Sequence, residues 1–153
     1  MSKKLFLLDL DHTLIYGSYA ETETANKLFK FNAFLSVYER PLARDLVVLC
    51  QEKGDIIIYT TALKTYAKKI SKSLGINPIQ ILSRKDCTKK NDSFKKNLNP
   101  EWIINYDEII VIDDSPNVWV NCTDSIKFFV PMEFRGDAQD LELQSIIEKV
   151  RML

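Results

Sequence analysis

The feature that most constrains the fold is a set of three apolar segments that each run into polar residues. They are KLFLLDL at 4–10, DIIIYT at 55–60 and EIIVIDD at 108–114. Their apolar cores are nearly continuous instead of alternating with polar residues, which is typical of strands covered on both faces. Segments of helical periodicity separate them. Strands that alternate with helices predict a parallel sheet with right-handed crossovers.

The other elements follow from periodicity and from the positions of glycine and proline. We expect helices over 41–53, 63–75 and 137–151. We expect short strands over 79–82 and 127–130, a hairpin over 27–31 and 34–38, and a polar loop region over 84–99. The predicted class is therefore α/β, an open parallel sheet of Rossmann type flanked by helices. A chain of 153 residues is expected to form one domain over 1–153.

The charge balance and the cysteines narrow the possible partners and compartments. Lys plus Arg equals Asp plus Glu at 21 each, so no overall field attracts nucleic acid or an anionic membrane. We expect no membrane partner, and no segment approaches the length of a membrane span. Nucleic acid is disfavoured, with a local lysine strip of Lys89, Lys90, Lys95 and Lys96 left open. The three cysteines are scattered without a CxxC pair, which argues against a disulfide framework or zinc site and predicts a cytoplasmic or nuclear protein. The oligomeric state is left open.

The polar ends of the three apolar strands should meet at one edge of the sheet, because ligands in open α/β sheets bind beyond the carboxyl ends. The residues delivered there are Asp9, Asp11, Thr60, Asp113 and Asp114. At about 4 Å, two like charges repel by roughly 4 kcal/mol at an effective dielectric near 20. A hard divalent cation relieves this repulsion, and Mg²⁺ suits carboxylates that share its shell with phosphate. His12, the only histidine, is expected to alternate to the far side of the strand.

These residue types suit phosphoryl transfer. A metal ion beside a carboxylate neutralises an incoming phosphate and lets the carboxylate act as a nucleophile. A second carboxylate can protonate the leaving oxygen and later deprotonate water. A hydroxyl such as Thr60 and an ammonium, from Lys95 or Lys96, would stabilise the phosphate oxygens.

The segment DLDHT at 9–13 matches the DxDxT motif of the haloacid dehalogenase (HAD) superfamily of phosphatases. The chain more closely resembles the catalytic domain of the TFIIF-associated and small CTD phosphatases (FCP/SCP-like, NLI-interacting factor-like), which act on the tail of RNA polymerase II. The segments that carry this resemblance occur in family order: DLDHTLI (9–15), ERP (39–41), IYTTALKTYA (58–67), ILSR (81–84), KKNL (95–98) and IDDSPNVW (112–119).

The resemblance implies catalytic roles. Asp9 resembles the nucleophile that forms an aspartyl-phosphate. Asp11 resembles the general acid/base, which also offers its backbone carbonyl to Mg²⁺. Thr60, with Thr61 beside it, corresponds to the phosphate-binding hydroxyl. The catalytic lysine best matches Lys96, with Lys95 as the alternative.

The resemblance also implies how the metal would be held. Asp114 resembles the direct Mg²⁺ ligand, and Asp113 a supporting carboxylate. The alternative is that Asp113 caps the turn into Pro116 and leaves Asp114 alone on the metal. Trp119 is expected to be a core residue.

The likeness extends to the substrate side. A small β insert, at about 16–39, is expected after the first motif, with no large cap, and an open cleft suits a phosphorylated side chain on a protein. Tyr19, Leu63 and Tyr66 correspond to an apolar substrate pocket, with Phe31 and Phe34 as possible additions, and Arg84 corresponds to a basic residue at its rim. Alternatively, the two tyrosines pack the insert against the body and Arg84 is ordinary surface charge.

The predicted function is a Mg²⁺-dependent phosphatase for phosphoserine or phosphothreonine in proteins, with phosphotyrosine not excluded. One alternative keeps the mechanism and changes the substrate to a small phosphate ester or a nucleic-acid 3′-phosphate. Another is a binding module that kept the fold and lost the chemistry. Loss normally shows as a missing nucleophile, acid/base or metal ligand, and all of these residue types are present.

Overall fold

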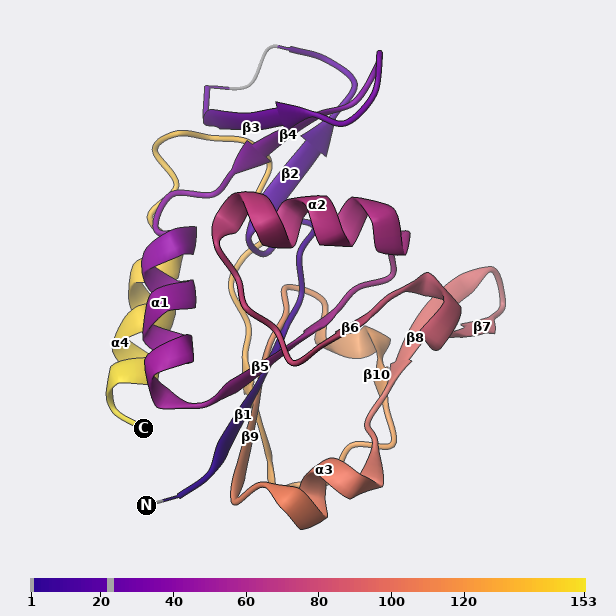
Figure 1. Ribbon diagram of the computed structural model, residues 1–153, viewed down its shortest axis with the longest axis vertical. Helices are drawn as coiled ribbons and strands as arrows, with labels where there is room; N and C mark the ends of the chain where they lie inside the picture. Colours follow the sequence, from indigo (N-terminus) through magenta and orange to yellow (C-terminus); the bar gives the residue numbers. More distant parts are fainter. Residues whose placement is uncertain (1, 22–23) are drawn as a thin grey trace.

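The computed structural model describes residues 2–21 and 24–153, and its centre is a five-stranded parallel sheet in the order β11-β9-β1-β5-β6 (Figure 1). The strands are β1 (Lys4–Leu8), β5 (Asp55–Tyr59), β6 (Gln80–Leu82), β9 (Glu108–Ile112) and β11 (Ile126–Phe129). Leu8 is in register with Ile58 of β5 and Ile112 of β9, so the carboxyl ends of the middle strands are level. The predicted open parallel α/β sheet is confirmed.

Both faces of this sheet are covered, which explains the continuous apolar runs. Phe6 and Leu8 of β1 pack in a core with α1 (Ala43–Lys53), α2 (Lys64–Leu74) and α4 (Leu143–Arg151). Leu5 and Leu7 face the other way, into a second core with Trp102 of α3 (Pro100–Asn105). Successive side chains of a strand point to opposite faces, so every position of β1 needs an apolar residue.

Two of the predicted helices lie close to their expected bounds, and the third is shorter. α2 ends at Leu74 because Gly75 adopts φ 70°, a left-handed conformation that favours glycine. The closing helix was predicted over 137–151 but begins at Leu143. The reason is a turn at its expected start, where the Asp140 carboxylate accepts the N–H of Glu142 and binds Arg40.

The expected hairpin is present and belongs to a three-stranded antiparallel sheet in the order β2-β4-β3. Its strands are β2 (Ile15–Ser18), β3 (Asn26–Lys30) and β4 (Ser36–Glu39). The turn between β3 and β4 is held by the Asn32 side chain, which accepts two backbone N–H groups. Figure 1 shows this small sheet beyond the carboxyl ends of the central strands. Residues 22 and 23 of the expected insert lie outside the described residues.

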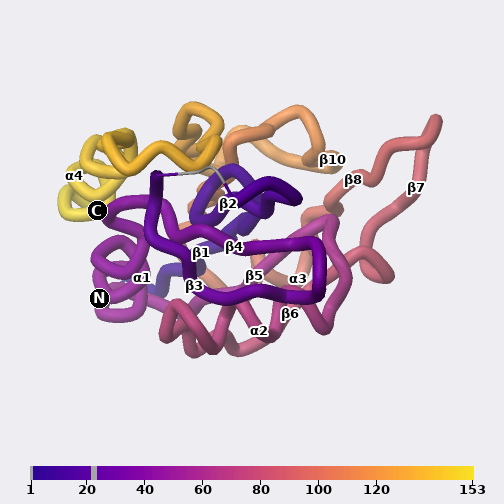
Figure 2. The backbone as a smooth tube through the Cα atoms, turned by 90° about the horizontal axis from the view of Figure 1, so that it is seen from above, coloured from indigo at the N-terminus to yellow at the C-terminus, as the bar shows by residue number. Residues whose placement is uncertain are grey.

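The prediction of a polar loop over 84–99 is wrong. The segment contains a 3₁₀ turn, η1 (Arg84–Asp86), and a β-hairpin of β7 (Thr88–Lys90) and β8 (Ser93–Asn97). Its two-residue turn uses Asn91 and Asp92 at φ 50° and 62°, the left-handed geometry that these residue types tolerate. β8 also pairs with β10 (Trp119–Val120), after the 3₁₀ turn η2 (Pro116–Val118). Figure 2 shows the hairpin extending away from the rest of the chain.

Within residues 2–21 and 24–153, no helix is long and apolar enough to cross a membrane.

Candidate active site

The polar residues predicted to meet at the carboxyl edge of the sheet, called the rim below, lie in loops that follow the strands. β1 ends at Leu8, so Asp9 and Asp11 follow the strand and do not lie on it. The N–H of Asp9 still donates to Ile112 O at 3.0 Å, which fixes Asp9 to the sheet. Asp11 belongs to a tight turn in which Leu10 O accepts several backbone N–H groups. The two carboxylates are therefore positioned by different parts of the backbone.

Lys96 lies between two of the carboxylates. Its Nζ is 3.0 Å from Asp9 Oδ1 and 2.7 Å from Asp113 Oδ2, and its side chain is almost fully buried. Burial by itself would lower the pKa of Lys96, but the charges of Asp9 and Asp113 outweigh it and raise the pKa. Lys96 is therefore a fixed ammonium. Lys95, the alternative, lies on the surface side and donates to Asn117 O.

Asp113 has a complete set of donors. Besides Lys96, it accepts the indole N–H of Trp119 at 2.9 Å and the backbone N–H of Ser115 at 2.9 Å. Burial, followed by the charge of Asp9, raises the pKa of Asp113 to about 6. Asp113 thus caps the turn and supports the site at once. Trp119, which was expected only to fill the core, also orients this carboxylate.

A single hydroxyl connects Asp9 and Asp114. Thr13 Oγ1 is 2.7 Å from Asp9 Oδ2 and 3.1 Å from Asp114 Oδ1, and it accepts the N–H of Asp114. A hydroxyl has one proton, so it cannot donate fully to both carboxylates. Burial raises the pKa of Asp9, and the hydrogen-bonding approach of Asp114 acts in the same direction. A further positive charge beside Asp9 and Asp114 would therefore stabilise the two carboxylates.

The donor set fits a hard cation. One carboxylate oxygen each from Asp9, Asp113 and Asp114 lies within 4.8 Å of the others. All three ligands are oxygens, which suits Mg²⁺ and not a thiolate- or imidazole-binding metal. The Asp11 carboxylate lies apart from this cluster and accepts the Tyr66 hydroxyl at 3.2 Å. Burial, then the charge of Asp9, raises the pKa of Asp11 to about 6.

A cavity of about 130 Å³ opens onto these groups. Its lining residues are Asp9, Asp11, His12, Thr61, Lys96, Asp113, Asp114, Ser115 and Val118. Thr61 forms the wall here, whereas Thr60 is buried and its hydroxyl accepts the N–H of Ala62. His12 follows the end of the strand, adopts a φ of 66° and is among the lining residues. Its ring makes its contacts with Phe134 O and Glu133, at 3.0 and 3.3 Å from Nδ1, and it is not one of the clustered possible metal ligands.

A second cavity, of about 340 Å³, lies next to Asp11. Its walls include most of the residues that the resemblance assigned to substrate: Tyr19, Phe31, Leu63, Tyr66 and Arg84. Arg84 is held in place because its Nε donates to Thr61 O at 2.9 Å. The aromatic ring of Phe34 is largely exposed and lies outside this group.

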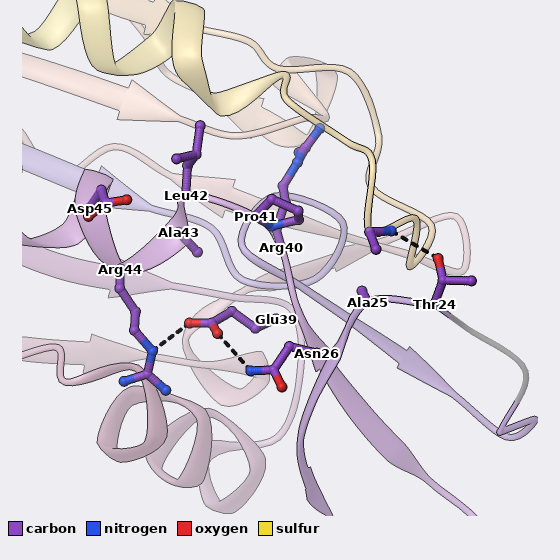
Figure 3. Close-up of a pocket in the computed structure, with 11 residues that line it drawn as sticks. Thr24, Ala25, Asn26, Glu39, Arg40, Pro41, Leu42, Ala43, Arg44 and Asp45 are labelled. Atoms are coloured by element: carbon purple, nitrogen blue, oxygen red, sulfur yellow. Dashed lines mark hydrogen bonds and ion pairs between the residues drawn. The ribbon is translucent and has the colours of Figure 1, made fainter.

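Sequence reasoning missed the contribution of Arg40. Its side chain is fully buried, and Nη1 donates to the carbonyls of His12 and Thr13, at 3.3 and 3.1 Å. Nε and Nη2 of the same guanidinium donate to the carboxylate of Asp140. Figure 3 shows Arg40 leaving the strand end beside Pro41, and its side chain reaching toward the C-terminal segment. These partners lie far from Arg40 along the chain, so no local sequence pattern predicts that Arg40 holds the loop of His12 and Thr13.

Comparison with known proteins decides the family. The profile of the NLI interacting factor-like phosphatases matches residues 4–153. The chain belongs to this family. A protein of Schizosaccharomyces pombe of unknown role is 26% identical over 125 residues, which cover 77% of this chain and 38% of the yeast protein.

Two solved structures share the fold of this family member. The RNA polymerase II CTD phosphatase Fcp1 superposes with a TM-score of 0.59 at 21% identity, over 98% of this chain and 49% of that chain. A fission yeast Fcp1 variant bound to beryllium fluoride superposes with a TM-score of 0.58 at 20% identity, over 98% of this chain and 50% of that chain. The chain thus spans half or less of these relatives' lengths. The likeness confirms the HAD-like α/β fold with a parallel sheet flanked by helices.

Proposed function

We propose that this chain is a Mg²⁺-dependent phosphoprotein phosphatase that works through an aspartyl-phosphate on Asp9. The observation that carries the proposal is the position of Asp9 at the cavity, with Lys96 on one oxygen and Thr13 on the other. Membership in a phosphatase family supports the same reaction class.

In the first step, an Asp9 carboxylate oxygen attacks phosphorus and the bond from phosphorus to the substrate oxygen breaks. Asp11 gives its proton to the departing oxygen. The raised pKa of Asp11, about 6, leaves part of the population protonated near neutral pH. Lys96 stays charged throughout and balances the negative charge on Asp9 and the phosphate.

In the second step, Asp11 is a carboxylate and accepts a proton from water. The water oxygen attacks phosphorus, the acyl-phosphate bond breaks, and inorganic phosphate leaves with Asp9 restored. The Tyr66 hydroxyl, which donates to Asp11 at 3.2 Å, keeps that carboxylate oriented between the two steps.

The metal would be held by Asp9 and Asp114, with the Asp11 carbonyl, and Asp113 would support it. This division follows from the hydrogen bonds, because Asp113 already accepts three and Asp114 shares a single hydroxyl with Asp9. When bound, Mg²⁺ supplies positive charge that lets two anions approach each other.

A phosphorylated protein side chain is the proposed substrate, with phosphoserine or phosphothreonine ahead of phosphotyrosine. The cavity beside Asp11 supports this, since Leu63, Tyr66 and Tyr19 offer apolar surface next to the reacting phosphate. A small phosphate ester would leave this surface unused. A nucleic-acid 3′-phosphate remains the alternative that the lysines near the site favour.

The test is hydrolysis of p-nitrophenyl phosphate, with and without Mg²⁺, by the parent and by Asp9→Asn. We expect turnover that depends on Mg²⁺ and is abolished by the substitution, because the amide is not a nucleophile. Circular dichroism of the variant checks that it folds. A folded parent without turnover on this ester or on a panel of phosphopeptides would contradict the proposal and favour a binding module.

A further inference from the structure

The β7–β8 hairpin with the turn before it, residues 84–97, is the most basic stretch of the chain, and it is called the basic hairpin below. It carries six basic residues and two acidic ones, a local charge of +4 in a chain whose net charge is zero. Only Lys96 takes part in the proposed chemistry. The remaining lysines and Arg84 have no role in the reaction derived above.

The pairing of the hairpin sorts these charges onto two faces. Phe94 and Lys96 share a face because they are two residues apart on β8, and Lys89 lies directly opposite Phe94. Lys96 reaches Asp9, so this face is turned toward the active site. Lys90 lies opposite Ser93, on the reverse face.

Arg84 completes the face that is turned toward the active site. Its guanidinium carbon is 5.1 Å from the centre of the Phe94 ring, and its Nε is bound to Thr61 O in the wall of the active-site cavity. Arg84, Phe94 and Lys89 therefore form a continuous strip that leads from the active site along the hairpin. This strip is called the basic strip below.

The charge of the basic strip is not neutralised within the described part of the chain. The ion pairs of residues 2–21 and 24–153 involve neither Arg84 nor Lys89. The nearest acid in the sequence, Asp86, uses its carboxylate to accept the N–H of Ser83 and cap η1. Asp92, the other acid of the hairpin, lies in the turn at its tip.

We propose that the basic strip binds acidic or phosphorylated side chains of the substrate peptide that flank the residue being dephosphorylated. This inference rests on the proposed phosphoprotein phosphatase function and adds a sequence preference to it. Two residues along β8 span about 7 Å, and an extended peptide advances about 3.3 Å per residue. The preferred acidic residue should therefore lie about two to four positions from the phosphorylated one.

A peptide fits the strip better than nucleic acid does. Double-stranded DNA carries one charge per about 1.7 Å and is bound through many phosphate contacts. The basic strip offers two cations around one ring, beside a cavity lined by Leu63 and Tyr66. Isolated acidic side chains on a peptide match that spacing.

The experiment compares kcat/KM for two phosphopeptides that differ only in having Glu or Gln at the flanking positions. We expect the parent to prefer the acidic peptide by about five-fold at low salt, and the preference to shrink in 0.5 M NaCl. Lys89→Glu should reduce the preference to about one. Lys90→Glu, with the same charge change on the reverse face, should leave it above about three-fold.

Each other outcome has a defined meaning. A parent preference near one, or an equal loss in Lys89→Glu and Lys90→Glu, would overturn the basic strip while leaving the phosphatase in place. Hydrolysis of p-nitrophenyl phosphate but of neither peptide would instead contradict the proposed protein substrate. Faster hydrolysis of a 3′-phosphorylated oligonucleotide that Lys89→Glu slows would assign the strip to nucleic acid and overturn the proposal. Lys89→Ala, whose folding is checked by circular dichroism, removes the same charge without reversing it, so it replaces Lys89→Glu if the charge-reversed hairpin misfolds.

Discussion

Lys96 and Lys89 belong to the same two-stranded hairpin and face the same way, yet their surroundings differ in nearly every respect. Lys96 is buried between Asp9 and Asp113, and its charge is fixed by them. Lys89 is exposed and makes no ion pair within the described residues. One residue type is thus a rigid part of the proposed catalytic site at one end of the hairpin, and an exposed charge, proposed to bind substrate, at the other.

The contrast shows that burial alone gives these two lysines different environments, which suit the two different roles proposed for them. At its base, the desolvated charges interact strongly and tolerate little change. Toward its tip, water screens each charge, so single substitutions should affect affinity for an anionic partner and hardly affect the fold. Four predictions test this difference between buried and exposed charges, in the hairpin and in the rest of the chain, from the largest expected effect to the smallest.

Lys96→Met should have the largest effect. The substitution removes the ammonium between two buried carboxylates, Asp9 and Asp113, so kcat should fall by about 10²–10³ or more. The protein should also lose about 3–5 kcal/mol of unfolding free energy at pH 7. Steady-state kinetics and urea unfolding measure the two effects. Lys95→Met is the matched control, and a similar loss in both variants would contradict the assignment of Lys96.

Arg40→Met should destabilise the protein by about 3–5 kcal/mol, because it leaves Asp140 and several backbone carbonyls without their buried donor. Urea unfolding provides the measurement. We expect Arg40→Lys to recover only part of the stability, since an ammonium lacks the planar fork. If Arg40→Met were as stable as the parent, the clamp on the loop of His12 and Thr13 would have no energetic role.

The buried carboxylates predict how pH and metal affect stability. Asp11 and Asp113 have pKa values near 6 in the fold, against 3.8 for an ordinary carboxyl group. The folded state therefore binds protons more tightly, so this contribution to stability is complete below about pH 4 and is lost as pH rises through about 6.

Burial also raises the pKa of Asp9, which is a proposed metal ligand, so Mg²⁺ would compete with protons for this carboxylate. Mg²⁺ should therefore raise the melting temperature by several degrees at pH 7 and by less at pH 5. A thermal shift series with and without Mg²⁺ at the two pH values measures this, with Asp114→Asn as the control for binding at the rim. An equal shift at both pH values would contradict metal binding by these carboxylates.

The smallest effect is expected at the tip of the hairpin. Lys89→Ala and Lys90→Ala should each change the unfolding free energy by less than about 0.5 kcal/mol, because both side chains are exposed and unpaired within the described residues. Urea unfolding of the two variants decides this. A loss of 2 kcal/mol in either would show that the lysine supports the fold, and it would weaken the assignment of the strip to binding.

Much of the fold followed from local sequence. The three apolar runs predicted the central strands because a strand buried on both faces needs apolar residues at every position. Gly75 marked a helix end for a backbone reason that is equally local. The β7–β8 hairpin was not predicted because its strands are polar and exposed. Asn91 and Asp92 are residue types that favour such a turn, so the local sequence does contain a signal for it.

The sequence by itself determined which residue types reach the rim, since parallel strands must deliver their carboxyl ends to the same edge. Only the tertiary structure decided how those residues divide their work. It set Lys96 and not Lys95 between the carboxylates, saturated Asp113 with donors, and left Asp9 and Asp114 to share Thr13. It also brought together Arg40 and Asp140, 100 residues apart, beside the loop of His12 and Thr13. The physical reason is that hydrogen bonding and burial depend on distances between segments remote in the chain, which local periodicity does not encode.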